Sequence, residues 1–428
     1  MKDSVGYELS GCNAQAIDLL ERGLYEMRCY AVDPLASADA ALAAAPECVM
    51  AHVLRAWLHV LGTEAPALPV AREALSAARV LPHTEREAGH LRAIELWANG
   101  RWHAAGRALE DLNIAYPRDV LALQAGHQLD FFTGDARMLR DRIARAMPAW
   151  SSATPGWHAV LGMHAFGLEE CGDYAQAERL GRAAVELEPR DAWAQHAVAH
   201  VMEMQGRTQE GVRWMRANAG WQQGSFLGVH NWWHLALYHL ARGETDEVLA
   251  LFDGPIDGAG SAVVMELIDS AALLWRLELA GVDVGARWQS VADRFAPAAG
   301  SGNYAFNDLH AAMAFVRAGR DAQLNELLAA QQAAMARDDD NAAFTREVGA
   351  PATQAVIAYA SGDFARSVEL LRPVRNIAHR FGGSHAQRDL LDQTLIAAAR
   401  RGGRSGLVAA LEAERAAAAR SRRQGLAS

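Results

Sequence analysis

Hydrophobic residues recur at helical spacing along nearly the whole chain. Leu20, Leu24 and Met27 fall on one side of a helix, as do Leu267 and Leu274 further along. Runs in which apolar and polar residues alternate strictly, as in half-buried β-strands, are nearly absent. The pattern therefore predicts an all-α protein.

Glycines mark where many of these helices end. Each of them comes just before a residue that opens the next helix, and glycine suits this place because the left-handed conformation costs it little. These glycines are Gly62, Gly100, Gly134, Gly172, Gly206, Gly243, Gly281, Gly319 and Gly362. Their successive separations are 38, 34, 38, 34, 37, 38, 38 and 43 residues. The prolines Pro46, Pro117, Pro148 and Pro189 mark the ends of partner helices.

A period of this length with two helices per unit is typical of tetratricopeptide-type repeats. We therefore expect a right-handed tetratricopeptide-type α-solenoid of about eleven helix pairs. The expected pairs cover residues 14–45, 48–80, 84–116, 118–147, 156–187, 190–219, 230–253, 262–296, 303–337, 347–380 and 384–420. A helical bundle without a repeat is the alternative.

The chain has no low-complexity linker, so we expect one continuous solenoid over residues 1–428. Polar chemistry concentrates in the repeats of residues 190–400, which we expect to bear a pocket. The last residues, 420–428, are expected to form a frayed tail.

Composition narrows the choice of partners and location. The formal net charge of −10 argues against nucleic acid and anionic membranes as partners. The apolar runs fall short of the ~20 residues of a membrane-spanning helix, and the first residues lack the apolar segment of a secretory signal. The four cysteines form no CxxC pair, so we expect reduced, mostly buried thiols in a cytoplasmic protein. No glycine-rich phosphate-binding motif occurs.

Histidine is concentrated in the first helices of the expected pairs. Thirteen of the sixteen lie there: His52, His59, His90, His127, His158, His164, His196, His200, His230, His234, His239, His310 and His385. In a solenoid of this type the first helices line the concave face, so we expect an imidazole-rich lining. Any single histidine can instead have a structural role, bonded to a neighbouring carbonyl.

In the repeats of residues 190–400, the successive first helices carry polar residues at helical spacing. Charged residues within apolar helices are costly unless they are paired or face a wet cavity, so we expect a shared small-molecule pocket. The expected ligand-binding residues are Glu203, Trp221, His230, Asn231, Trp233, Arg276, Asn307, Asp308, His385, Gln387, Arg388 and Asp389.

The segment NAGWQQGSFLGV, residues 218–229, interrupts the repeat. Its glycines and its Trp221 and Phe226 suit a lid beside a pocket, and a long connection between repeats is an equally good interpretation. Within HNWWH, Trp233 is expected to form an aromatic wall.

The histidine spacing permits two kinds of chemistry. HxxxHxxE at His196, His200 and Glu203, and HxxxH at His230 and His234, would suit a metal ion. We favour a site with no metal and no cofactor, where histidine titrates near neutral pH and a carboxylate orients it. The expected catalytic residues are His200, His234, Asp269 and His310.

Five segments together resemble a known family. HAVAHVMEMQGR, HNWWHLALYHLARGE, DSAALLWRLELAG, NDLHAAMAF and GGSHAQRDL look like signatures of the tetratricopeptide repeat protein 38 family, and the resemblance covers essentially the whole chain. It implies a tetratricopeptide-like fold and points to the polar residues of these segments. It implies no settled substrate.

The sequence supports two possible functions. The first is a small-molecule site that acts by acid–base chemistry between histidine and carboxylate, which leaves open whether the chain is an enzyme. The second is an interaction scaffold that holds a peptide or partner protein in its concave groove. The end repeats of a solenoid can also pair into a homodimer.

Overall fold

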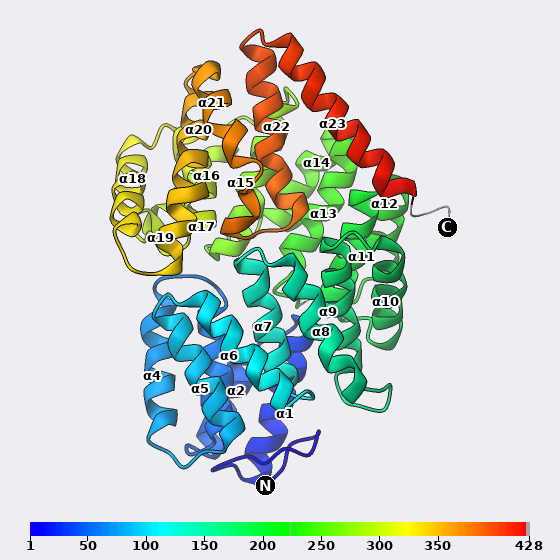
Figure 1. The fold of residues 1–428 in the computed structure, drawn as a ribbon, viewed down its shortest axis with the longest axis vertical. Helices are drawn as coiled ribbons and strands as arrows, with labels where there is room; N and C mark the ends of the chain where they lie inside the picture. Colours follow the sequence, from blue (N-terminus) through cyan, green and yellow to red (C-terminus); the bar gives the residue numbers. More distant parts are fainter. Residues whose placement is uncertain (223, 425–428) are drawn as a thin grey trace. The chain divides into compact units, whose positions relative to one another are not determined.

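The computed structural model describes residues 1–222 and 224–424, and it is almost entirely helical (Figure 1). Within these residues the only β structure is two isolated bridges, Lys2 to Glu8 and Ala31 to Ser225. The all-α prediction is confirmed. No helix in this described part of the chain is long and apolar enough to cross a membrane.

Contacts along the chain divide it into two compact units. The first comprises Met1–Val198 and Asn218–Gly228, and the second comprises Ala199–Ala217 and Val229–Ser428. The first unit contains α1 (Ala14–Cys29), α2 (Pro34–Ala44), α3 (Val49–Val60), α4 (Ala67–Arg79), α5 (Glu85–Ala98), α6 (Trp102–Ala115), α7 (Val120–Phe132), α8 (Ala136–Ala146), α9 (Trp157–Glu170) and α10 (Tyr174–Leu187).

The helix α11 (Ala192–Met204) crosses the division and ends in the second unit. The second unit continues with α12 (Thr208–Ala217), α13 (Gly228–Ala241), α14 (Thr245–Leu251), α15 (Val264–Leu279), α16 (Arg287–Phe295), α17 (Ala305–Ala318), α18 (Asp321–Met335), α19 (Asp340–Phe344), α20 (Ala350–Ala360), α21 (Phe364–Val374), α22 (His385–Arg401) and α23 (Ser405–Gln424).

Consecutive helices pack in pairs, as the repeat predicts. In the first unit α1 packs on α2, α3 on α4, α5 on α6 and α9 on α10. In the second unit α15 packs on α16, α17 on α18, α20 on α21 and α22 on α23 (Figure 1). The packing is consistent with a helical repeat, and the thirteen histidines singled out in the sequence lie on α3, α5, α7, α9, α11, α13, α17 and α22.

The predicted pair at residues 347–380 starts too late. Helical backbone begins at Asp340, passes through a π-helical turn at Thr345–Gly349 and continues into α20. The Asp339 side chain caps this start by accepting a hydrogen bond of 2.8 Å from the Ala342 amide. Asp339 is thus the N-cap of a helix that begins before the predicted pair.

The repeating glycines have the predicted conformation, with one exception. Gly100, Gly134, Gly172, Gly206, Gly243, Gly281, Gly319 and Gly362 all have positive φ. At Gly62 the positive φ falls on the next residue, Thr63, at 57°. An aspartate follows three of these glycines and caps the next helix, at Asp135, Asp173 and Asp363. These Gly–Asp pairs end one helix and begin the next.

The expectation of four reduced cysteines is wrong for two of them. Cys12 and Cys48 form a disulfide, with their Cα atoms 4.4 Å apart. The N-terminal segment lies along the start of α3, where the Val49 amide donates to the Ser10 carbonyl at 3.2 Å, and this brings the two cysteines together. Cys29 is a buried free thiol and Cys171 an exposed one.

The end of the chain is helical as far as it is described. α23 continues to Gln424, and Arg423 Nε donates to the Gln205 carbonyl at 3.1 Å. Residues 425–428 of the predicted tail lie outside the described residues.

Candidate functional site

Four helices of the second unit bring eight of the predicted site residues together. We call this group the polar centre. Its members are His200 and Glu203 from α11, His230, Trp233 and His234 from α13, Asp269 and Arg276 from α15, and Asp389 from α22.

Two histidines of the polar centre are each bonded to a carboxylate. His230 Nδ1 lies 2.9 Å and 3.0 Å from the two carboxylate oxygens of Asp269. His234 Nδ1 lies 2.9 Å from Glu203 Oε2. The two rings are four residues apart on α13 and therefore share one face of that helix. The helix thus places two histidine–carboxylate pairs next to each other.

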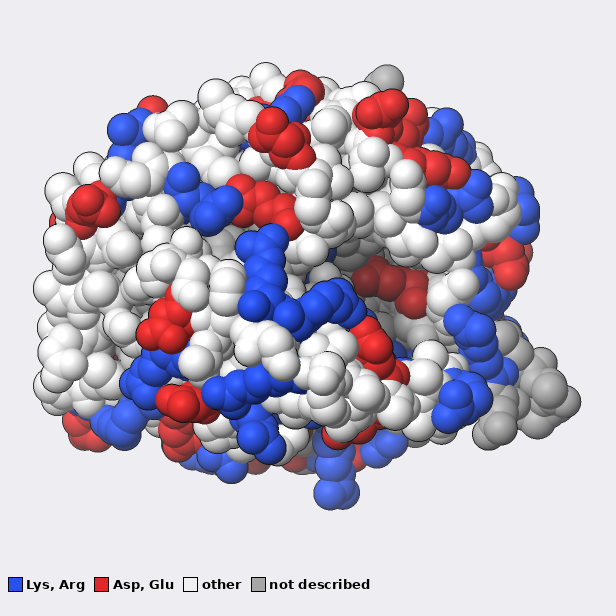
Figure 2. Space-filling model, turned by 90° about the horizontal axis from the view of Figure 1, so that it is seen from above, with Lys and Arg blue, Asp and Glu red and all other residues white. Residues whose placement is uncertain are grey.

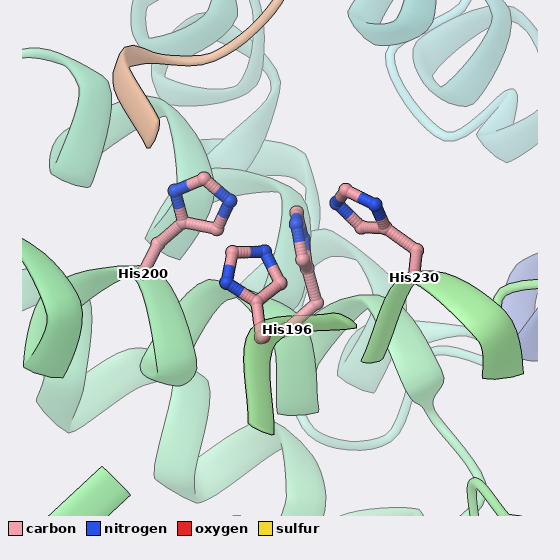
Figure 3. Close-up of side chains that lie close together, drawn as sticks. His196, His200 and His230 are labelled. Carbon is pink, nitrogen blue, oxygen red and sulfur yellow. The ribbon is translucent and has the colours of Figure 1, made fainter. Parts of the chain in front are cut away.

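A third imidazole completes this group of rings. His200 projects from α11, one helical turn after His196, and Figure 3 shows the rings of His200 and His230 turned toward each other. The ring centroids of His200 and His234 are 4.5 Å apart, and those of His230 and His234 are 4.9 Å apart. His200, His230 and His234 each offer a nitrogen within 4.8 Å of those of the other two. These are the side chains of the polar centre that could hold a metal ion.

Trp233 forms the aromatic wall of this group. Its fully buried ring stacks on His230, with a centroid separation of 5.3 Å and an interplanar angle of 14°. The guanidinium carbon of Arg276 lies 5.7 Å from the Trp233 ring centroid. A cation at this distance from an indole face is attracted to it, so Trp233 links the histidines to Arg276.

Arg276 is a buried cation, only 4% exposed. Its Nη2 donates to the Ala386 carbonyl of α22 at 2.6 Å. Its Nε is buried and has no hydrogen-bond partner among the described residues. Burial lowers the pKa of Arg276, while the negative charges of Asp389 and Glu203 act in the opposite direction. A guanidinium with so few hydrogen bonds is costly to bury unless something else binds it.

Asp389 is held by an arginine that no sequence pattern predicts. Arg415 from α23 contacts both carboxylate oxygens, one of them at 3.0 Å, and Gln393 Nε2 donates to Asp389 Oδ2 at 2.6 Å. Burial raises the pKa of Asp389, but Arg415 and Arg276 outweigh it and the net shift is downward. Arg415 lies in an alanine-rich helix without any motif, so no local signal could have found it.

Burial governs the protonation of the Glu203–His234 pair. It raises the pKa of Glu203 to about 7, although Arg276 and His230 act to lower it. It also lowers the pKa of His234 well below its ordinary value, and His230 and Arg276 lower it further. Both shifts favour the uncharged forms, a carboxylic acid at Glu203 and a neutral imidazole at His234.

The polar centre is not sealed from solvent. The side chain of Glu203 is 21% exposed and that of His230 is 15% exposed, whereas those of His234 and Asp269 are 0% and 3% exposed. Two members therefore reach the surface while their partners are buried.

Three other predicted residues, Asn307, Asp308 and His310, lie on α17. His310 Nδ1 donates to the Phe306 carbonyl at 2.8 Å, and burial lowers the pKa of His310 to about 4. Burial raises the pKa of Asp308 to about 7, although Arg337 and a hydrogen bond from Gln331 oppose this. The hydrogen bond of His310 to a backbone carbonyl is typical of a structural histidine.

Gln387 and Arg388 act locally at the start of α22. The Gln387 side chain accepts a hydrogen bond of 3.0 Å from the Ser384 amide, as part of a capping box. Arg388 donates to the Gly383 carbonyl. The remaining predicted residues are Asn231, fully buried on α13, and Asn307 and His385, partly buried on α17 and α22.

Trp221 and its loop belong to the first unit, not to the unit that holds the polar centre. The Trp221 side chain is fully buried, whereas Phe226 is 45% exposed. The Phe226 amide donates to the Tyr30 carbonyl at 3.0 Å, and the Val32 amide donates to the Gly224 carbonyl at 2.5 Å. The loop is therefore fixed by backbone hydrogen bonds to the residues that follow α1.

The first unit also has a surface cavity, of about 460 Å³, beside α6 and α8. Its lining includes Arg142 and Asn113, which are hydrogen-bonded to each other at 3.1 Å.

Basic and acidic side chains lie side by side across the face of the molecule seen in Figure 2.

No model of a known protein family matches this chain. The assignment of a function therefore depends on the chemistry of the polar centre itself.

Proposed function

We propose that the polar centre binds a small molecule that carries an anionic group, with Arg276 as the residue that recognises the anion. The buried Arg276 Nε without a hydrogen-bond partner among the described residues is the observation that supports this most strongly. A carboxylate or phosphate oxygen would accept from this donor in a charge-assisted hydrogen bond.

The surroundings of Arg276 favour a small ligand over a peptide. An aromatic wall at Trp233 and several convergent polar groups are typical of small-molecule sites. Peptide grooves in helical repeats lie open along the surface, whereas Trp233, His234 and Asp269 are buried. The scaffold function expected as the alternative therefore has less support.

A thermal-shift screen of small carboxylates and phosphates tests this proposal. One class of anion should raise the melting temperature of the wild-type chain, because a ligand that binds only the folded state stabilises it. The shift should disappear in Arg276→Met. It should persist in the matched control Arg317→Gln, since Arg317 pairs with Glu278 outside the polar centre. A screen without any shift, or a shift that survives Arg276→Met, would refute the proposal.

We further propose that the helix pairs belong to a tetratricopeptide-type α-solenoid of the tetratricopeptide repeat protein 38 family. The glycine period of 34 to 43 residues and the five family-like segments support this assignment. Small-angle scattering that fits a superhelix would agree with it, and a scattering profile of a closed bundle would contradict it. A cytoplasmic location stays a prediction.

A further inference from the structure

We infer that His200, His230 and His234 form a binding site for a divalent transition metal ion such as Zn²⁺. The inference deepens the proposed function and rests on it, because it concerns the same polar centre. It replaces the metal-free chemistry expected from the sequence.

The geometry of the three rings suits a metal ion. One nitrogen from each lies within 4.8 Å of the others. A tetrahedral metal with Zn–N bonds of ~2.0–2.1 Å would hold these nitrogens roughly 3.3 Å apart. The side chains of the three histidines would have to rotate to bring their nitrogens from within 4.8 Å to this distance. Imidazole nitrogens are preferred ligands of Zn²⁺, Cu²⁺ and Ni²⁺.

Carboxylates lie behind two of the rings. Asp269 accepts from Nδ1 of His230 at 2.9 Å, and Glu203 lies 2.9 Å from Nδ1 of His234. An ionised carboxylate that accepts from Nδ1 fixes the tautomer in which Nε2 carries the lone pair that binds a metal. For His234 this requires Glu203 in its ionised form, which the charge of a bound cation would favour. Metal-binding histidines in proteins usually have such a second partner, which orients the ring and increases its basicity.

The number of histidines also suits a metal that binds a further ligand. Three histidines leave the fourth tetrahedral position open, as in sites where the metal holds water or a ligand. The partial exposure of His230 and Glu203 gives an ion access to the rings. The three histidines project from helices, which are more rigid than surface loops, and carboxylates orient two of the rings.

Titration of untagged, chelator-stripped protein with Co²⁺ tests the inference, because tetrahedral Co²⁺ absorbs visible light. We expect one Co²⁺ per chain, displaced by Zn²⁺. Both His200→Ala and His234→Ala should lose the absorption. The control His239→Ala should keep it, because His239 lies on the same helix but pairs with Glu244 at 2.6 Å. Absence of the bands in the wild type, or their persistence in both variants, would overturn the inference.

If a histidine variant loses its helical circular dichroism and is therefore unfolded, Asp269→Asn provides a second test of the metal site. The change keeps the size of the side chain but removes its charge, and it should weaken Co²⁺ binding about 10- to 100-fold. Unchanged affinity would overturn the inference. The two proposals can fail separately: an anion-induced thermal shift without Co²⁺ binding removes only the metal site, and Co²⁺ binding without any anion response removes only the anion-binding function.

Discussion

Two buried arginines, one in each unit, have very different surroundings. Arg142 in the first unit donates to Asp130 at 2.7 Å and 2.9 Å, to Asn113 at 3.1 Å and to the Gly106 carbonyl at 3.2 Å. Arg276 in the second unit is similarly buried, but its Nε has no partner in the described part of the chain. The protein thus satisfies one buried guanidinium with its own groups and leaves the Nε of the other without a partner among the described residues.

Histidines show a related difference. In the first unit His90 uses both ring nitrogens, accepting from Trp57 Nε1 at 3.1 Å and bonding Asp119 at 3.0 Å. In the second unit His230 and His234 each bond a carboxylate through Nδ1 and gather with His200 around a common point. Similar residue types thus form separate contacts in one unit and a cluster in the other, and we propose that the cluster is a binding site.

The largest expected loss of stability comes from breaking the hydrogen-bonded network around Arg142. Asp130→Ala leaves the Arg142 guanidinium buried without its counter-ion and should lower the free energy of unfolding by about 3–5 kcal/mol. Urea denaturation followed by circular dichroism measures this. The control Asp141→Ala removes a half-buried carboxylate whose partners, Arg137 and Arg140, are exposed, and it should cost no more than about 1 kcal/mol. Equal costs for the two variants would mean that the Arg142 network is not structural.

The next effect concerns pH and Asp308 in the second unit. Because burial raises the pKa of Asp308 to about 7, the folded state binds more protons than the unfolded state between about pH 4 and 7. The free energy of unfolding therefore falls as the pH rises from about 4 to 7, because ionised Asp308 is less favourable in the folded state than in the unfolded state. Asp308→Asn should raise the free energy of unfolding at pH 8 by up to roughly 4 kcal/mol and change it little near pH 4. A constant difference between the two proteins across this range would contradict the prediction.

Asp119 in the first unit should show the opposite sign. Although burial acts to raise its pKa, His90, Arg86 and the Ala122 amide lower the pKa of Asp119 to about 2. Its stabilisation is present above about pH 4 and is lost as the pH falls toward 2. Asp119→Asn should cost roughly 2 kcal/mol at pH 7, and the cost should shrink in acid. Denaturant midpoints at pH 7 and pH 3 give the comparison, and a cost that grows in acid would refute it.

The smallest expected change in stability is that of Arg276→Met. This variant removes a buried charge that has few hydrogen bonds, and methionine fills much of the space with apolar atoms. Its free energy of unfolding in the absence of ligand should lie within about 1 kcal/mol of the wild type. Chemical denaturation checks this, and a loss as large as that of Asp130→Ala would show that Arg276 is as structural as Arg142.

Local signals made much of the fold predictable from the sequence. The αL glycines, such as Gly172, and the apolar periodicity depend on neighbours within one or two turns, so the helix pairs could be placed. The Cys12–Cys48 disulfide joins residues 36 positions apart, and the Arg415–Asp389 pair joins residues 26 positions apart. No local sequence pattern predicts either contact.

The sequence points to residues that the structure brings together in the polar centre, but it does not predict which of them bond to each other. His200, His230, His234 and Asp269 stand out because polar residues recur in apolar first helices. That His234 bonds Glu203 while His230 bonds Asp269 depends on how residues 31 and 39 positions apart come together when their helices pack. For the same reason, the sequence counts His90 among the expected lining histidines, although the structure gives both of its ring nitrogens a partner.

The most direct test is a crystal structure of untagged protein purified without chelators, with anomalous diffraction recorded at the zinc absorption edge. We predict a metal peak between His200, His230 and His234, and non-protein density within hydrogen-bond distance of Arg276 Nε. A structure in which only protein atoms and water contact these groups, even after soaking with Zn²⁺ and with the anion that gives the strongest thermal shift, would contradict both proposals for the polar centre.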